Sequence, residues 1–267
     1  MKVSDIFRII GMNLKFTYKI HIAWLPKINA ILENVLFPSF ESIFFILVSL
    51  YYNNDPRPIS YYIIGSLCFT SINSSIDGVG MLIFAERRFG TLSHTMSSVF
   101  HSFWIFLGRV LYWTLIGYVR FLSTLLALYL VFGLDFFSLK TFLMFNVLYF
   151  FICLSNSGIG YMLGIIGMIK RSVLGYTQVI SLMILLLSGV YFSTDLLPEI
   201  LQHIGGLIPL TYGIEAAREL IANGISDAFI QNLSYMLLTG VFFNVIGLMA
   251  YKKFEIDVIK KSKLDVF

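Results

Sequence analysis

Long runs of apolar residues, separated by short polar segments, dominate the pattern along this chain. Each run has about 20 residues or more, the length that an α-helix needs to cross a hydrocarbon core of ~30 Å. The ~10-residue alternation that is typical of a membrane β-barrel is absent. We therefore expect an all-α membrane protein in which residues 1–267 form a single transmembrane domain. The pattern predicts six spans, at approximately Leu32–Tyr52, Ile59–Ile83, Ser102–Phe132, Leu139–Ile169, Val173–Phe192 and Ile230–Tyr251.

The first segment, residues 1–27, has a helical period but too many charges to span a membrane. Its apolar residues fall on one helical face, namely Phe7, Ile10, Leu14, Tyr18 and Ile22. Its charged residues fall on the opposite face, namely Asp5, Arg8, Lys15 and Lys19. This arrangement predicts an amphipathic helix that lies in the membrane interface. A solvated helix packed on the bundle is the alternative.

Two other segments are also more than simple turns. Residues 84–98 begin with Glu86, Arg87 and Arg88, turn at Gly90, and continue from Thr91 and Leu92 like a short helix. Glycine at position 90 would let the chain turn sharply. We expect a structured segment here whose exposed charges could contact a soluble partner.

Residues 193–229 contain apolar pieces that are broken by Pro198, Pro209 and a pair of glycines, and each piece is too short to span. Irregular backbone is tolerated at membrane depth only where protein covers it. We therefore expect re-entrant or interfacial helices between the fifth and sixth spans.

Composition supports a membrane location. The chain is 58% hydrophobic and 13% charged, whereas a soluble domain carries about 25% charged residues. Most of the 19 Lys and Arg residues flank the termini and alternate connections, whereas the opposite connections carry only Arg57, Lys140 and Arg218. The positive-inside rule then places both termini and residues 84–98 in the cytoplasm and residues 193–229 outside. The net charge of +4 orients the spans and does not indicate a nucleic-acid partner.

The sequence offers little support for an enzyme. It contains no GxxxxGK[ST] nucleotide-binding loop, no pair of histidines at metal-ligand spacing and no evident Ser-His-Asp set. Cys68 and Cys153 both lie inside predicted spans and are expected to be buried free thiols. We expect no catalytic site, no metal and no cofactor in this chain, so its energy would come from a partner.

Four charged residues lie well inside the predicted spans, namely Glu41, Asp77, Arg109 and Arg120. Arg109 and Arg120 are three helical turns apart and share a face. Because an unpaired charge at membrane depth is costly, we hypothesise the pairs Glu41–Arg120 and Asp77–Arg109, within one subunit or across a dimer. They could be structural ion pairs or could line a conduit.

The middle of the second span is unusually polar and should point into the protein or a cavity. Ser71 and Asn73 in this span, with Gln178 in the fifth span, are candidates to line a substrate path. The many Phe and Tyr residues suit a path for an apolar or amphipathic substrate, but they are equally ordinary for side chains that face lipid.

The order of these features resembles the permease subunits of type-2 ATP-binding-cassette exporters. The resemblance is carried by Glu-Arg-x-x-Gly-Thr-Leu from Glu86 to Leu92 and by the region after the fifth span. That region contains Ser188-Gly189, then Leu197-Pro198-Glu199-Ile200, then Pro209-Leu210-Thr211-Tyr212, followed by Glu215 and Arg218. It departs from the family pattern at Ile208, where Asn is common. The resemblance extends over nearly the whole chain.

The resemblance implies a dimer with a second permease subunit, identical or different, together with two copies of a cytosolic ATPase that binds ATP and Mg. Residues 84–98 would be the coupling helix that is seated on this ATPase. The alternative for Arg87 and Arg88 is that they only fix the topology. The location implied is the plasma membrane, and the leaning toward Ile, Phe, Asn and Lys suggests an AT-rich bacterium.

Three functions follow as hypotheses. The first is export of an amphipathic molecule, such as a drug, an antibiotic or a hydrophobic peptide. The second is export of a lipid-linked polysaccharide or teichoic acid. The third, from another class, is a membrane scaffold or immunity protein that does not transport.

Overall fold

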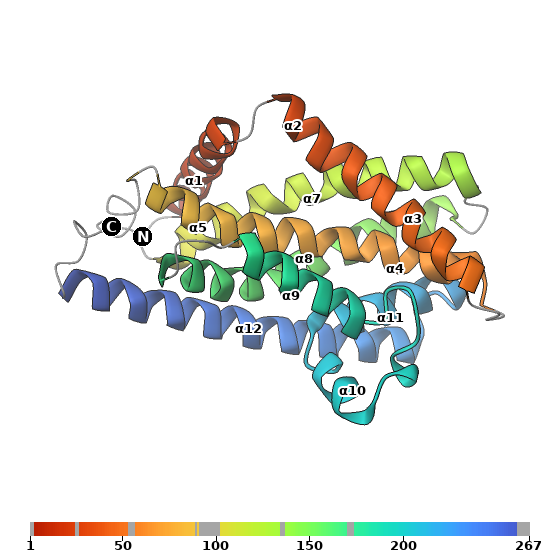
Figure 1. Cartoon of the computed structure of the whole chain (residues 1–267). Coiled ribbons are helices and arrows are strands. Elements are labelled where there is room, and N and C mark those ends of the chain that lie inside the picture. The colour runs from red at the N-terminus through yellow and green to blue at the C-terminus, as the bar shows by residue number, and fades with distance from the viewer. Residues whose placement is uncertain are drawn as a thin grey trace.

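The structure, a computed structural model, describes residues 3–24, 27–52, 57–88, 90, 102–133, 137–169 and 174–260. Within these ranges every regular element is a helix, and the long helices lie side by side in one elongated bundle (Figure 1). The first described helix is α1 (Val3–Trp24). The first long helix of the bundle has three parts, α2 (Lys27–Ile31), the π-helical turn η1 (Leu32–Leu36) and α3 (Phe37–Tyr52).

The second long helix also has three parts, α4 (Ile59–Ile72), the π-helical turn η2 (Asn73–Gly78) and α5 (Val79–Arg88). The remaining helices follow in order as α7 (Ser102–Phe132), α8 (Leu139–Ile169), α9 (Leu174–Leu187), η3 (Thr194–Leu196), α10 (Glu199–Gly205), α11 (Pro209–Ala222) and α12 (Asp227–Lys260).

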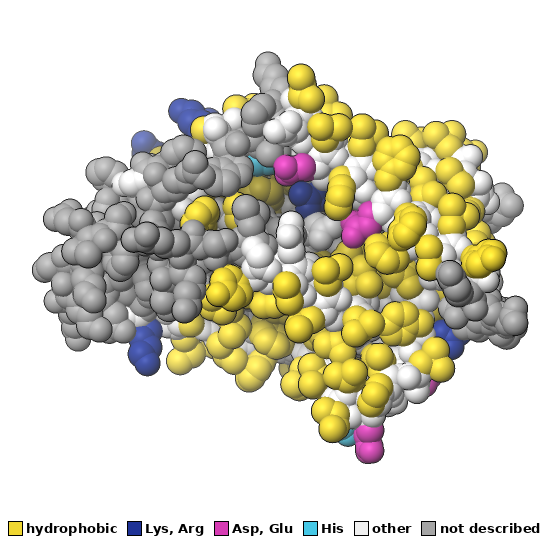
Figure 2. Space-filling view, viewed as in Figure 1, with side chains coloured by type: hydrophobic (Ala, Val, Ile, Leu, Met, Phe, Trp, Pro, Cys, Tyr) yellow, Lys and Arg dark blue, Asp and Glu magenta, His cyan; other side chains and the backbone are white. Residues whose placement is uncertain are grey.

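Five helices in the described residues are long and apolar enough to cross a membrane. They include Ile28–Tyr51, Ile59–Glu86, Phe103–Phe132, Leu139–Ile166 and Asp227–Lys253. A face of the bundle is covered mostly by hydrophobic side chains (Figure 2), as expected where lipid is the surrounding solvent. The predicted multi-pass helical membrane protein is therefore confirmed.

The fifth predicted span is shorter than the sequence indicated. The prediction continued to Phe192 because residues 190–192 are apolar, but α9 ends at Leu187 and Gly189 adopts a positive φ of 69°. This left-handed conformation, which favours glycine, turns the chain out of the helix. At 14 residues, α9 is about 21 Å long. The count of six spans therefore stays a prediction.

The helix formed by α4 and η2 is the centre of the core. All residues from Tyr62 to Ile72 are buried, and α3, α7, α8 and α11 pack around α4. Its polar side chains bond to neighbouring helices: Thr70 shares a hydrogen bond of 2.9 Å with the Tyr149 hydroxyl, and Ser75 Oγ donates to the Cys153 carbonyl at 3.0 Å. The prediction that the polar middle of this span points inward is confirmed.

Small residues let α8 approach its neighbours closely. A Cβ on Gly160 would lie 2.3 Å from the Ser75 carbonyl oxygen of η2, and one on Gly158 would lie 2.4 Å from the Asn244 nitrogen of α12. These backbones are therefore in contact, as the Gly160-x-x-x-Gly164 spacing predicts. The glycines of α8 hold η2 on one side and α12 on the other.

The N-terminal helix α1 packs along α7 and α5. The side chains turned toward the bundle are Ile9, Thr17 and Ile20, which are buried. Phe7 and Tyr18, from the predicted apolar face, remain exposed. The helix thus uses one face for the bundle and keeps part of its apolar face available for a membrane surface.

His21 fixes the end of α1 to α7. Its Nδ1 shares a hydrogen bond of 2.6 Å with the Tyr112 hydroxyl, and its ring lies 4.8 Å from that of Trp113. Burial, and then the positive charge of Arg120, lower the pKa of His21 from 6.5 to about 4. The neutral ring is therefore the form that packs here.

Replacing Gly160 with Val should destabilise the bundle, because the new side chain would have to displace the backbone of η2. Overpacking of this kind costs about 1–3 kcal/mol. Gly11→Val is the matched control: it also places a valine at a mid-helix glycine, but its Cβ would meet nothing within 4 Å. Thermal unfolding of the purified variants in detergent checks this, and equal stability of the two variants would contradict it.

The docking of α1 should weaken as the medium is acidified. Because the folded pKa of His21 is lowered, its contribution is fully present above about pH 6.5 and is lost as the pH falls toward about 4. Hydrogen exchange of the α1 amides, corrected for intrinsic rates, measures this. His21→Phe keeps the aromatic packing but cannot titrate, so its α1 exchange should be independent of pH. If α1 exchange in this variant depended on pH as in the wild type, His21 would not be the group responsible.

Candidate functional site

A buried ion pair joins α5 to α7 near the start of the connection between them. Arg109 Nη2 lies 2.5 Å from Glu86 Oε1, and the two side chains are 2% and 0% exposed. Glu86 is in the last turn of α5, and Arg109 lies about two turns into α7. The pair therefore ties together the two helices that flank residues 89–101.

Aromatic side chains from three helices enclose this pair. Phe106 of α7 stacks on Tyr161 of α8 with 3.7 Å between the ring centroids, and Tyr251 of α12 lies 6.3 Å from Tyr161, edge to face. Tyr161 and Tyr251 are both close enough to Arg109 to interact with its charge. A charge pair shielded from water in this way interacts more strongly than one at a surface. The pair therefore lies at a junction where α5, α7, α8 and α12 meet.

The position of Glu86 corrects one prediction. The sequence indicated an exposed carboxylate that could contact a soluble partner, but Glu86 is buried and contacts Arg109 instead. The sequence did contain a signal for this pair, because Glu86 and Arg109 lie at similar distances from the connection between the second and third spans. Gly90 has a φ of 68°, which confirms the predicted sharp turn. The side chains of Arg87 and Arg88, and residues Thr91 and Leu92, lie outside the described residues.

The Arg120 guanidinium forms a hydrogen bond with the side-chain amide of Asn34. Its Nε donates to Asn34 Oδ1 at 2.9 Å, and Ser123 Oγ donates to the Asn34 carbonyl at 3.2 Å. Asn34 lies in the π-helical turn η1, and the sequence reasoning did not identify it. A π-turn has no clear sequence signal. The pair Glu41–Arg120 stays a prediction.

Asp77 lies in η2, and its side chain is outside the described residues. Its proposed pairing with Arg109 therefore stays a prediction, while the ion pair that is seen for Arg109 goes to Glu86.

The three candidate path residues have different surroundings. Ser71 is buried and accepts a hydrogen bond of 3.3 Å from the Asn156 amide of α8. Asn73 of η2 is half-buried and Gln178 of α9 is exposed. Ser71 therefore connects α4 to α8 within a single chain. Of the three candidate path residues, only Asn73 and Gln178 reach the surface.

The segment from α9 to α12 has the short-helix architecture that the sequence predicted. Pro198 precedes α10, Pro209 is the first residue of α11, and Leu210 is fully buried. Thr211 Oγ1 donates to the Gly205 carbonyl at 2.7 Å, which connects α11 to the end of α10. The Tyr212 ring lies 5.3 Å from that of Tyr235 in α12. These residues of the motif therefore fix α11 in the bundle.

Arg218 anchors this segment to the spans. Its Nη2 donates to the carbonyls of Gly189 at 2.8 Å and Val190 at 3.1 Å, and its guanidinium lies 3.4 Å from the ring centre of Tyr61. Nη1 pairs with Glu215, which is about half exposed, at 2.9 Å. One cation thus holds together α11, the start of α4 and the turn that ends α9. The sequence resemblance identified Glu215 and Arg218 but not these contacts.

No group of three His, Cys, Asp or Glu side chains that could hold a metal occurs in the part of the chain that the structure describes. The ion pair of Arg109 and the hydrogen bonds of Arg218 connect helices at the two ends of the bundle.

Comparison with known families gives one match. The model described as ABC-2 type transporter (ABC2_membrane) matches residues 33–222, a range that runs from η1 to the end of α11 and includes Arg109 and Arg218. No curated protein matches the chain by sequence.

Removing one partner of the buried pair should be far more damaging than removing both. Glu86→Leu or Arg109→Met would strand a buried charge, at a cost of about 3–5 kcal/mol, whereas the double variant replaces the pair with apolar groups and should recover most of this loss. Thermal unfolding of the three variants measures the coupling.

Glu215→Leu is the control for this cycle. Its carboxylate is also paired to an arginine, but it is about half exposed, and exposed pairs contribute only about 0–1 kcal/mol. If the Glu86 and Arg109 losses were simply additive, the pair would not be the stabilising unit.

Proposed function

This chain belongs to the ABC-2 type transporter family of permease subunits, and we propose that a separate cytosolic ATPase drives it as an exporter. The observation that carries the proposal is the buried pair Glu86–Arg109. It joins the helices on both sides of residues 89–101, so a force applied to this connection would act on α5 and α7 together.

The coupling would proceed through charged and rigid contacts. Arg87 and Arg88 end α5, and guanidinium groups form strong hydrogen bonds with carboxylates on a partner surface. In the proposed arrangement these arginines and residues 91–92 contact the ATPase, while Glu86 transmits the displacement internally. The ATPase would supply the ATP and Mg sites, because the sequence contains no nucleotide-binding loop.

The proposed assembly is a dimer of permease subunits with two ATPase copies, with both termini and residues 84–98 in the cytoplasm. The exposed apolar face of α9 is the surface on which a second permease subunit would pack. Tyr176, Val179, Leu182, Met183 and Leu186 are all about half exposed. The location would be the plasma membrane of a bacterium, with α9 as the fifth of six spans and α10 and α11 as the outer re-entrant segment.

The proposed substrate is amphipathic. Asn73 and Gln178 reach the surface beside the apolar face of α9, and α9 packs against η2. Polar groups among apolar ones suit a molecule with both characters. The path would then form where two subunits meet, and a drug, an antibiotic or a hydrophobic peptide fits this chemistry.

Reversing the charges of Arg87 and Arg88 to Glu should weaken co-purification of an ATPase from the native membrane by about tenfold or more, because charge-assisted hydrogen bonds contribute about 1.5–3 kcal/mol each. Quantitative mass spectrometry of the purified complex measures the bound ATPase.

Lys252 and Lys253 provide the matched control. They are also an adjacent basic pair, they are exposed, and they follow Tyr251 of the Glu86–Arg109 junction on α12. Their reversal to Glu should leave the ATPase bound. If the wild-type chain retains no ATPase, the exporter proposal fails in favour of a membrane scaffold or immunity protein.

A further inference from the structure

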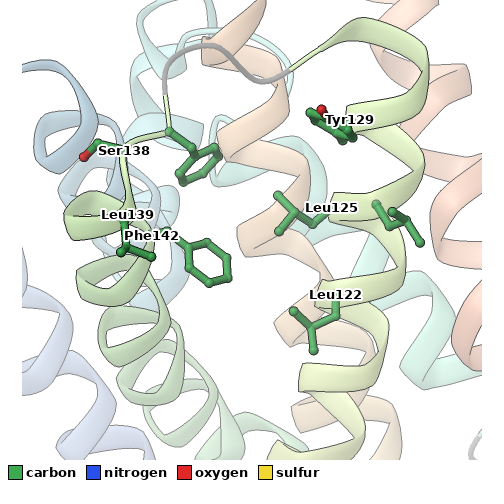
Figure 3. A pocket seen from close by; sticks show the side chains of 8 residues that line it. Leu122, Leu125, Tyr129, Ser138, Leu139 and Phe142 are labelled. Atoms are coloured by element: carbon green, nitrogen blue, oxygen red, sulfur yellow. The ribbon is translucent and has the colours of Figure 1, made fainter.

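An apolar groove lies between α7 and α8, at the end of the bundle away from Glu86 (Figure 3). Its volume is about 470 Å³, within the range of ~300–1,000 Å³ that is typical of ligand sites. One wall includes Leu122, Leu125 and Tyr129 of α7, and the other includes Leu139 and Phe142 of α8. The groove is thus a space between two candidate membrane spans.

The groove has an apolar end and a polar end. Figure 3 shows Leu122 at one end, and Tyr129 and Ser138 at the other. Lys140 is exposed in the first turn of α8, directly after Leu139. Its long side chain can extend an ammonium group toward the polar end while its stem covers apolar surface. The groove thus presents apolar side chains, then hydroxyl groups, then a positive charge. This order complements the acyl chain, polar region and negative headgroup of an anionic lipid.

The groove opens to the membrane and not to the core. Leu122 and Leu139 are 48% and 75% exposed, and both belong to helices that are candidate spans. Leu122 and Tyr129 are seven residues apart on one helix, which corresponds to about 10 Å along the membrane normal. This length lies within one leaflet of a core that is ~30 Å thick. The bilayer itself therefore supplies the natural occupant.

We propose that this groove binds one anionic membrane phospholipid, with an acyl chain between α7 and α8 and its phosphate near Lys140. The site is separate from the ATPase contact, and it does not depend on the substrate of the exporter. A lipid here would fill the space between two spans at the end opposite the Glu86–Arg109 junction.

The experiment titrates the purified full chain in detergent with phosphatidylglycerol or phosphatidylcholine of the same acyl chains and counts bound lipids by native mass spectrometry. The first phosphatidylglycerol should bind about fivefold more tightly than phosphatidylcholine, since one basic residue near a membrane surface contributes about this factor. Lys140→Gln should remove the preference.

Filling the groove should remove the site. Leu122→Trp should weaken the first phosphatidylglycerol by about tenfold or more, because the indole would occupy the space of the chain. Leu115→Trp is the matched control, since Leu115 lies two turns away on the same face of α7, is 55% exposed and does not line the groove. Leu139→Trp repeats the test from the other wall and covers the case in which Leu122→Trp does not fold.

Two results would overturn the proposal. One is equal affinity for the two lipids, which would mean that Lys140 selects no headgroup. The other is binding by folded Leu122→Trp and Leu139→Trp at the level of Leu115→Trp, which would mean that the lipids seen are only the ordinary boundary layer around the spans.

Discussion

The charge pair between α5 and α7 constrains much of the bundle, because neither charge could be buried alone. Shielding a lone carboxylate or guanidinium from water costs several kcal/mol, and close pairing offsets that cost only when the geometry is held. Tyr161 and Tyr251 bring α8 and α12 to the same place. The last turn of α5 is therefore bound to three other helices, and displacing it would displace them or break the pair.

A second constraint acts at the other end, where the chain leaves regular helices. Backbone carbonyls at the turn after α9 lie beyond the helix, and Val190 is fully buried, so these carbonyls need donors from other parts of the chain. Arg218 supplies hydrogen bonds to two of these carbonyls and a cation–π contact to Tyr61. The short helices α10 and α11 can therefore remain between α9 and α12 without leaving that turn unsatisfied.

The sequence predicted some elements well and others poorly, for physical reasons. The bounds of α7 and α8 agree with the prediction because polar or glycine residues end their apolar runs, such as Gly133 with its φ of 70°. Span five was overextended because Gly189 ends α9 inside an apolar run. Hydropathy reports the cost of contact with water, and it carries no information on the φ of one residue.

For the charged residues of the candidate site, the sequence likewise predicted the positions but not the partners. Charge spacing located Arg109 and Arg120 in a span and Glu86 beside a turn, but it could not determine their partners. Partner choice depends on the rotation of each helix about its axis, and that rotation follows from packing against several helices at once. Asn34 faces Arg120 from within a π-helical turn, and such a turn shifts the face of every residue that follows it. A strict helical period therefore does not give the face of a residue beyond this point.

These connections also restrict where a substrate could pass. Hydroxyl groups of the central helix bond to α8, because Thr70 shares a hydrogen bond with Tyr149 and Ser71 accepts one from Asn156. The Tyr149 hydroxyl in turn donates to the Gly117 carbonyl of α7. A path through this packing would need those bonds to break together with the close glycine contacts of α8. Of the three candidate path residues, Asn73 and Gln178 remain accessible, at the surface of η2 and α9. A path between two subunits would leave each bundle intact, so movement of whole bundles is the mechanism that this packing favours.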